Sequence, residues 1–109
     1  MAFDEITAER VRKLLKRRRG ITERKMFGGL AFMHRGHMCC GVMNRDLVLR
    51  LGEKGADEAL GARHTRTMDF TGTPLKSMVY LKPAGFRTDE ALKGWIERAL
   101  AFTKSLPAK

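Results

Sequence analysis

Three short apolar runs between residues 25 and 51 constrain the fold more than any other feature, because only a few residues separate one run from the next. The runs cover residues 25–33, 38–43 and 47–51. The first is too short and too rich in glycine for a good helix, and the third alternates leucine with other residues, as a half-buried strand does. Spacers this short join antiparallel strands, since a parallel pair needs a long crossover. We therefore predict an antiparallel meander in the middle of the chain.

A helical pattern precedes the meander, over residues 5–19. Acidic side chains lie near its start and four consecutive basic residues lie at its end, an order that complements the helix dipole. Gly20 follows as the expected C-terminal capping residue. The apolar residues that we expect on one buried side of this helix are Ile6, Val11, Leu14 and Leu15.

A second helical pattern lies near the C-terminus. Thr88 is the expected cap, two acidic residues follow in the first turn, and Pro107 ends the helix. The apolar residues recur at the i, i+3, i+4, i+7 and i+8 positions of a single stripe. They are Leu92, Trp95, Ile96, Ala99 and Leu100.

Between the meander and this helix we predict a short helix over residues 53–60, an edge strand over 68–70 and a further strand over 77–81. The order is therefore helix, antiparallel sheet, helix. This order is typical of an α+β domain in which a sheet of about four to five strands packs against N- and C-terminal helices.

Length and composition indicate one globular domain over residues 1–109. The 43% of apolar residues suffice for one core. The longest uncharged stretch, Met26 to His34, is too short to span a membrane, and the acidic N-terminus does not resemble a signal peptide. The only two cysteines are adjacent and cannot connect distant parts of the chain, which fits a reducing compartment. We expect a cytoplasmic protein that does not bind a membrane.

We expect no catalytic residue, cofactor or metal. The two serines lie outside any nucleophile motif, and the paired glycines belong to no phosphate-binding motif. His34, His37, Cys39 and Cys40 are close in sequence, but the second ligand pair of a structural zinc site is missing. In a regular strand the two adjacent cysteines point to opposite faces, so we expect one thiol in the core and one outside. A thiol or metal sensor at Cys39 and Cys40 is the less favoured alternative.

Positive charge is concentrated at the end of the first helix. The chain has 22 Lys and Arg against 12 Asp and Glu, a net charge of +10, and residues 1–25 contribute nine and four of these, or +5. Such a surface attracts phosphate backbones by counterion release, although a solvated helix face is the commoner role of a charge run. The residues that we expect to face nucleic acid or an acidic partner are Lys13, Lys16, Arg17, Arg18, Arg19, Arg24 and Lys25, with Arg10 one turn earlier.

The order of motifs resembles the N-terminal domain of the TfoX/Sxy family. The most specific piece is the Lys-Met-Phe-Gly-Gly run at 25–29, which is followed by Gly-His-Met at 36–38, Leu-Val-Leu-Arg at 47–50 and Trp-Ile-Glu-Arg-Ala-Leu at 95–100. The resemblance implies an α+β fold similar to that of secretion chaperones. We interpret the signature as structural: phenylalanine and leucine fill the core, and the glycines allow a close backbone approach. The signature residues are Lys25, Met26, Phe27, Gly28, Gly29, Phe32 and Trp95.

The same resemblance implies a bacterial regulator and not an enzyme. Founding members of the family promote the expression of DNA-uptake (competence) genes and act with the cyclic-AMP receptor protein at promoters. They carry a second, C-terminal domain, whereas we expect a single-domain member here. We therefore expect a non-enzymatic regulatory module that binds a protein partner, including its own copy in a homodimer. Direct binding of nucleic acid by the basic end of the first helix is the alternative.

Overall fold

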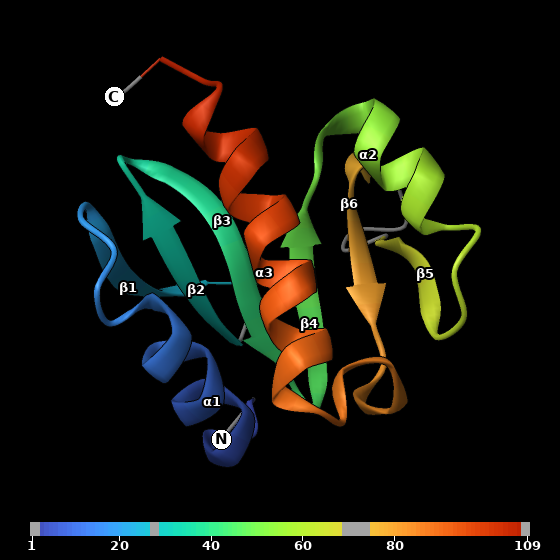
Figure 1. Cartoon of the computed structure of the whole chain (residues 1–109), viewed down its shortest axis with the longest axis horizontal. Coiled ribbons are helices and arrows are strands. Elements are labelled where there is room, and N and C mark those ends of the chain that lie inside the picture. The colour runs from blue at the N-terminus through green and yellow to red at the C-terminus, as the bar shows by residue number, and fades with distance from the viewer. Residues whose placement is uncertain (1–2, 27–28, 69–74, 108–109) are drawn as a thin grey trace.

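The computed structural model describes residues 3–26, 29–68 and 75–107, in which a six-stranded sheet carries helices on one face (Figure 1). Neighbouring strands pair antiparallel in the order β1-β2-β3-β4-β6-β5. The strands are β1 (Ile21–Met26), β2 (Gly29–His34), β3 (His37–Met43), β4 (Asp46–Arg50), β5 (Thr65–Met68) and β6 (Leu75–Leu81). The helices are α1 (Glu5–Leu15), α2 (Gly52–Ala59), the short 3-10 helix η1 (Pro83–Phe86) and α3 (Asp89–Lys104).

The meander is confirmed, and it has one more strand than the sequence predicts. The first apolar run contributes to two strands, since β1 ends at Met26 and β2 begins at Gly29. Residues 22–25 of β1 are polar and show no apolar alternation, so periodicity does not reveal them as a strand. Polar residues are common on an edge strand such as β1. The sheet accordingly has six strands and not four to five.

α1 is shorter than expected and buries a different side. It ends at Leu15, so Gly20 does not cap it and lies instead, at a φ of +77°, in the turn before β1. A longer helix would place Lys16 and Arg17 one turn beyond Arg12 and Lys13, and such like-charge pairs disfavour continuing the helix. Ile6 is 74% exposed, because the buried positions recur as 7–8, 11 and 15 and Ile6 falls outside that series. Val11 is buried as expected.

α3 matches its prediction closely. Thr88 accepts a hydrogen bond from the amide of Ala91 at 3.0 Å, and the predicted stripe faces the sheet, with Trp95 only partly buried. The helix packs against β3 and β4 (Figure 1) and ends at Lys104, three residues before Pro107. Among the described residues, no helix combines the length and apolar character that crossing a membrane requires.

The remaining elements agree with the expected ones to within a few residues. The short helix α2 begins one residue earlier than predicted, and β6 begins two residues earlier. The predicted edge strand at 68–70 corresponds to β5, which lies at the edge of the sheet but upstream, over residues 65–68. Asp69 and Phe70 lie outside the described residues.

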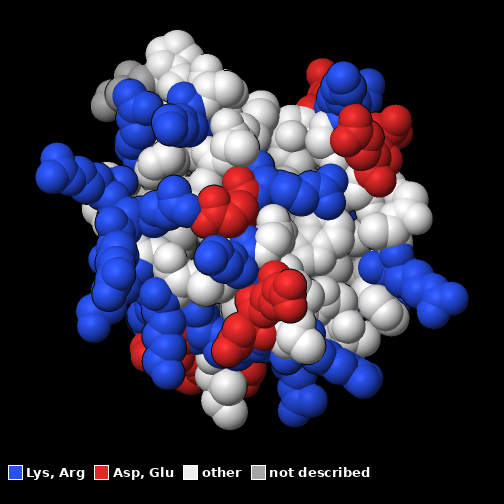
Figure 2. All heavy atoms as spheres, viewed as in Figure 1, with Lys and Arg blue, Asp and Glu red and all other residues white. Residues whose placement is uncertain are grey.

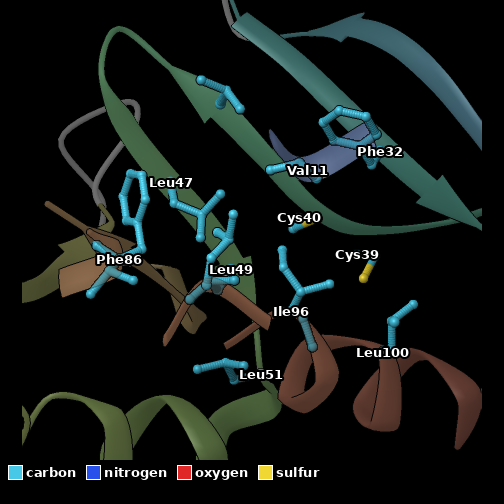
Figure 3. Close-up of a cluster of buried hydrophobic side chains, with 14 of the residues drawn as sticks. Val11, Phe32, Cys39, Cys40, Leu47, Leu49, Leu51, Phe86, Ile96 and Leu100 are labelled. Atoms are coloured by element: carbon cyan, nitrogen blue, oxygen red, sulfur yellow. The ribbon is translucent and has the colours of Figure 1, made fainter. Parts of the chain in front are cut away.

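The main core lies between the helices and the sheet, and its central side chains are drawn in Figure 3. Because strand residues alternate between faces, the residues next to this core in β4 and β6 lie on the opposite face. There Val48, Met78 and Tyr80 form a second, smaller apolar cluster. The largest fully buried side chains of the main core include Val11, Phe32, Leu47, Leu49, Phe86, Leu92 and Ile96.

Three of the described signature residues, Gly29, Phe32 and Trp95, have a packing role, and Lys25 does not. Phe32 is buried in the main core, Trp95 packs against it, and Lys25 is exposed. Gly29 lies so close to β3 that a Cβ atom there would be 2.4 Å from the carbonyl oxygen of Val42. Phe27, Gly28 and the side chain of Met26 lie outside the part that the structure describes.

The close approach at Gly29 predicts the effect of adding one methyl group. Gly29→Ala forces the β2–β3 backbones apart, and we expect the free energy of unfolding to fall by about 1–3 kcal/mol, the usual cost of overpacking. Gly94→Ala in α3 is the matched control, because a Cβ atom there meets nothing within 4 Å. It should gain roughly 0.5–1 kcal/mol from higher helix propensity. Denaturant unfolding measures both, and equal midpoints for the two variants would contradict the packing at Gly29.

Candidate functional site

A groove of about 500 Å³ lies where the loop after α1, the β2–β3 turn and the C-terminal half of α3 meet. Figure 2 shows Lys and Arg side chains crowded on this side of the molecule, at the left of the view. The groove contains four cationic side chains and one carboxylate. Its lining residues are Arg18, Arg19, His34, Arg35, Glu97, Leu100, Ala101 and Lys104.

Polar contacts join the three walls of the groove in pairs. The amide of Arg35 in the β2–β3 turn donates to the carbonyl of Gly20 in the loop after α1, at 2.9 Å. The same loop is tied to α3 by an ion pair between Arg18 and Glu97. His34 Nδ1, at the end of β2, lies 2.8 Å from Thr103 Oγ1 in the last turn of α3. The groove is therefore a fixed concavity and not a gap between independent loops.

A further contact fixes the loop that carries the basic run. The guanidinium of Arg12 in α1 binds both carboxylate oxygens of Glu23 in β1, at 2.8 and 2.9 Å. This two-point geometry sets the direction in which the chain leaves α1 and enters β1. Arg10, in contrast, turns away from the groove and donates to the carbonyl of Phe86 at 2.8 Å. Arg10 therefore holds η1 and does not belong to the basic surface.

Most of the positive charge in the groove is uncompensated. Arg18 is paired with Glu97. Within residues 3–26, 29–68 and 75–107, no carboxylate lies within ion-pair distance of Arg19, Arg35 or Lys104. Three cations from three separate segments thus face a shared concave surface, an arrangement that suits a phosphate or another anion.

The structure divides the basic residues that the sequence singled out. All seven are exposed: Lys13, Lys16, Arg17, Arg18, Arg19, Arg24 and Lys25. Only Arg18 and Arg19 line the groove. Glu23 reaches α1, so its neighbour Arg24 points to the opposite face of the sheet. The role of these residues in binding stays a prediction.

The sequence did not predict two of the groove cations, Arg35 and Lys104. They are 69 positions apart and neither belongs to a charge run. Only the pairing of β2 with β3 and the packing of α3 on the sheet bring them beside the loop after α1. The one sequence feature that could have indicated Arg35 is its position as a basic residue in a predicted turn.

The histidine in the groove favours its neutral form. Burial lowers the pKa of His34 below its usual value, and the nearby positive charges of Arg35 and Arg18 lower it further, as do His37 and Lys104. A neutral imidazole has one ring nitrogen free to accept a hydrogen bond. The hydroxyl of Thr103 donates to the carbonyls of Ala99 and Leu100, so we assign the ring hydrogen to Nδ1, which donates to the Thr103 oxygen and leaves Nε2 as the acceptor.

Behind His34 lie the two cysteines, and both are fully buried as free thiols. The expectation of one buried and one outward thiol is therefore wrong. The cause is a β-bulge: Phe32 pairs with Cys40 and Met33 pairs with Met38, so Cys39 is an extra residue in β3. A bulge interrupts the alternation of side chains between the two faces. Figure 3 shows both thiols on the α3 side of the sheet.

The two thiols differ in acidity. Hydrogen bonds from Cys40 and from Thr103 lower the pKa of Cys39, against the effect of burial. The hydrogen bond with Cys39 and burial raise the pKa of Cys40 well above its usual value. Among the described residues, no group of three or more His, Cys, Asp or Glu side chains is arranged to hold a metal ion.

Comparison with known proteins gives one match. The model of the family described as the TfoX N-terminal domain matches residues 13–103. This range covers the last three residues of α1, the whole sheet and nearly all of α3. No curated protein and no solved structure matches the chain.

The neutral state of His34 predicts how stability depends on pH. Because the pKa of His34 is lower in the folded than in the unfolded chain, protonation favours unfolding as the pH falls below the unfolded value of about 6.5. His34→Gln removes this titration. We expect the stability advantage of the wild type over His34→Gln to shrink as the pH falls from about 7.5 to about 5.5. Urea unfolding at a series of pH values measures the difference, and a constant difference would contradict the neutral assignment.

Proposed function

We propose, on the premise that the chain belongs to the TfoX N-terminal domain family, that it is a non-enzymatic regulatory module that binds nucleic acid through the groove. The competence genes that founding family members regulate suggest a transcriptional role of the same kind. The phosphate backbone is the ligand that we assign to the groove. Sequence-independent attraction would bring the module to DNA, and a regulatory partner would supply the choice of site.

The observation that carries this proposal is the set of three groove cations that meet no carboxylate among the residues that the structure describes. Arg19, Arg35 and Lys104 come from three walls that are tied to one another, so their positions do not depend on one flexible segment. Two of the three are arginines, whose planar guanidinium groups match phosphate oxygens with paired hydrogen bonds. Binding at this groove needs no general base and no nucleophile.

The wide distribution of positive charge over the chain favours nucleic acid over an acidic protein segment as the ligand. The net charge of +10 is spread beyond the groove, and residues 1–25 hold only half of it. A duplex presents a continuous row of phosphates, so it can use this wider field, whereas a short acidic segment can fill only the groove. An acidic protein partner is the outcome that remains if nucleic acid fails to bind.

The groove predicts which charges matter for DNA binding. We expect Arg19→Ala and Arg35→Ala each to reduce the salt dependence of binding by about 0.9 in the slope of log K against log salt, one phosphate contact each. Arg24→Ala is the matched control, because it removes the same charge from the opposite face of the sheet. Fluorescence anisotropy with a labelled duplex, titrated with salt, measures all three variants.

Two results of this titration would count against the proposal. If Arg24→Ala weakens binding as much as Arg19→Ala does, the charge acts as a diffuse field and the groove has no special role. If the wild type does not bind any duplex at physiological salt, the partner is an acidic protein.

We also propose a homodimer that forms on the sheet face opposite the helices. The second apolar cluster lies there, with Met38 and Met43 partly exposed beside it. The edge strand β1 is less suited to self-association, because Glu23, Arg24 and Lys25 are charged and edge charges oppose strand addition. The groove, which lies on the helix side, would stay open in such a dimer.

Light scattering after size-exclusion chromatography tests the dimer. At tens of micromolar protein we expect twice the mass of the chain for the wild type, and a monomer for Met38→Lys, which places a charge in the apolar face. Arg24→Ala should remain a dimer. A monomeric wild type at that concentration would rule the homodimer out.

A further inference from the structure

We propose that Cys39 and Cys40 form a dithiol that a hydroperoxide oxidises to a disulfide between these two neighbouring residues. The proposal goes beyond the proposed function and does not depend on it. It rests on the placement of both thiols by the bulge, on the polar contact behind them, and on the way α3 covers them.

The β-bulge places both thiols on the same side of the sheet, which a regular strand would not do. A bond between adjacent cysteines closes a strained ring of eight atoms, because adjacent Cα atoms are about 3.8 Å apart and most disulfides join Cα atoms about 4.4–6.8 Å apart. The ring can close only when both sulfur atoms lie on the same side of the backbone. In a regular strand consecutive side chains point to opposite faces. In β3 the extra residue Cys39 breaks that alternation, and both thiols lie on the α3 side in the main core (Figure 3).

Thr103 gives one of the two thiols a polar contact inside an apolar core. Its side chain is fully buried, donates to the carbonyls of Ala99 and Leu100 at 3.3 and 3.2 Å, and is one of the groups that lower the pKa of Cys39. The same hydroxyl lies 2.8 Å from His34 Nδ1 at the floor of the groove. The lowered pKa of Cys39 and the raised pKa of Cys40 are consistent with Cys39 as the attacking thiol.

The chemistry balances with one hydroperoxide for each pair of thiols. Cys39 gives up its thiol proton, the thiolate attacks the peroxide and the O–O bond breaks. The departing hydroxide takes up that proton, giving water and a sulfenic acid. The sulfur of Cys40 then attacks the sulfur of Cys39, the S–O bond breaks, and the departing hydroxide takes the proton of Cys40. With hydrogen peroxide, two thiols and one oxidant yield one disulfide and two waters.

The end of α3 controls access to the thiols. Leu100 and Thr103 in its last turns pack over β3, and beyond the helix the carbonyl of Pro107 lies 2.5 Å from His37 Nε2. Helix ends open locally at much lower free energy than the whole domain unfolds. A hydroperoxide is small, so a brief opening of this last turn suffices to admit it.

Mass spectrometry of the peroxide-treated wild-type protein tests the proposal. Trypsin cleaves after Arg35 and Arg45, so one peptide, residues 36–45, carries both cysteines. We expect this peptide from native protein to lose two hydrogen atoms on treatment with hydrogen peroxide, and dithiothreitol to restore it. Oxidation of Met38 or Met43 in the same peptide adds oxygen and is thereby distinguished.

Two single variants separate the roles of the thiols. In Cys40→Ser the reaction should stop at a sulfenic acid on Cys39, which dimedone traps. In Cys39→Ser the remaining thiol should react about tenfold more slowly than Cys39 does in Cys40→Ser, because burial still raises the pKa of Cys40 and only Cys39 has Thr103 to lower its pKa. Circular dichroism checks that both variants are folded.

Three results would overturn the proposal. One is a wild-type peptide that gains only oxygen, and another is a disulfide that forms only between chains. A third is an equal reaction rate for the two single variants. The wild-type measurement needs no substitution, so it decides the question even if a variant does not fold. None of these measurements involves nucleic acid, so failure here leaves the proposed function untouched.

Discussion

The packing of α3 across the middle of the sheet holds the rest of the structure in register. Its apolar stripe is buried against β3 and β4, and each fully buried leucine or isoleucine of the stripe contributes about 1.5–3 kcal/mol by leaving water. The polar residues of the same helix depend on that placement. Glu97 meets Arg18 and Thr103 meets His34 only because the stripe fixes both the rotation and the position of the helix along its axis. A shift of one turn would separate both pairs.

The sequence reveals the elements whose signals are local. The cap at Thr88 and the stripe that follows it define α3, and short spacers between apolar runs define the meander. β1 is missed because its side chains are charged and its strand character comes from pairing with β2. Ile6 is placed on the wrong side because it is five positions before Val11, about 140° away around the helix, and only its apolar character assigned it to the stripe. The packed structure shows which side of α1 is buried.

The site was harder to predict than the fold, because it depends on contacts between distant segments. The charge run correctly points to Arg18 and Arg19, but the alternation along β1 places Arg24 on the other face and removes it from the groove. Arg35 and Lys104 join the groove through the β2–β3 turn and α3. The bulge at Cys39 has no sequence signal at all, because it is a difference in length between two paired strands.

The crowding of cations in the groove has a consequence for the protein on its own. Among the described residues Glu97 alone offsets the four positive side chains, so the walls repel one another. The hydrogen bonds between the walls and the core beneath them hold the walls together against that repulsion. Dissolved salt screens like charges as well as opposite ones. Rising ionic strength should therefore strengthen this corner of the fold while it weakens any association with a polyanion. An anionic chain bound in the groove would reduce the repulsion between the groove cations, as salt does. The bound chain and dissolved ions would therefore compete for the same cations.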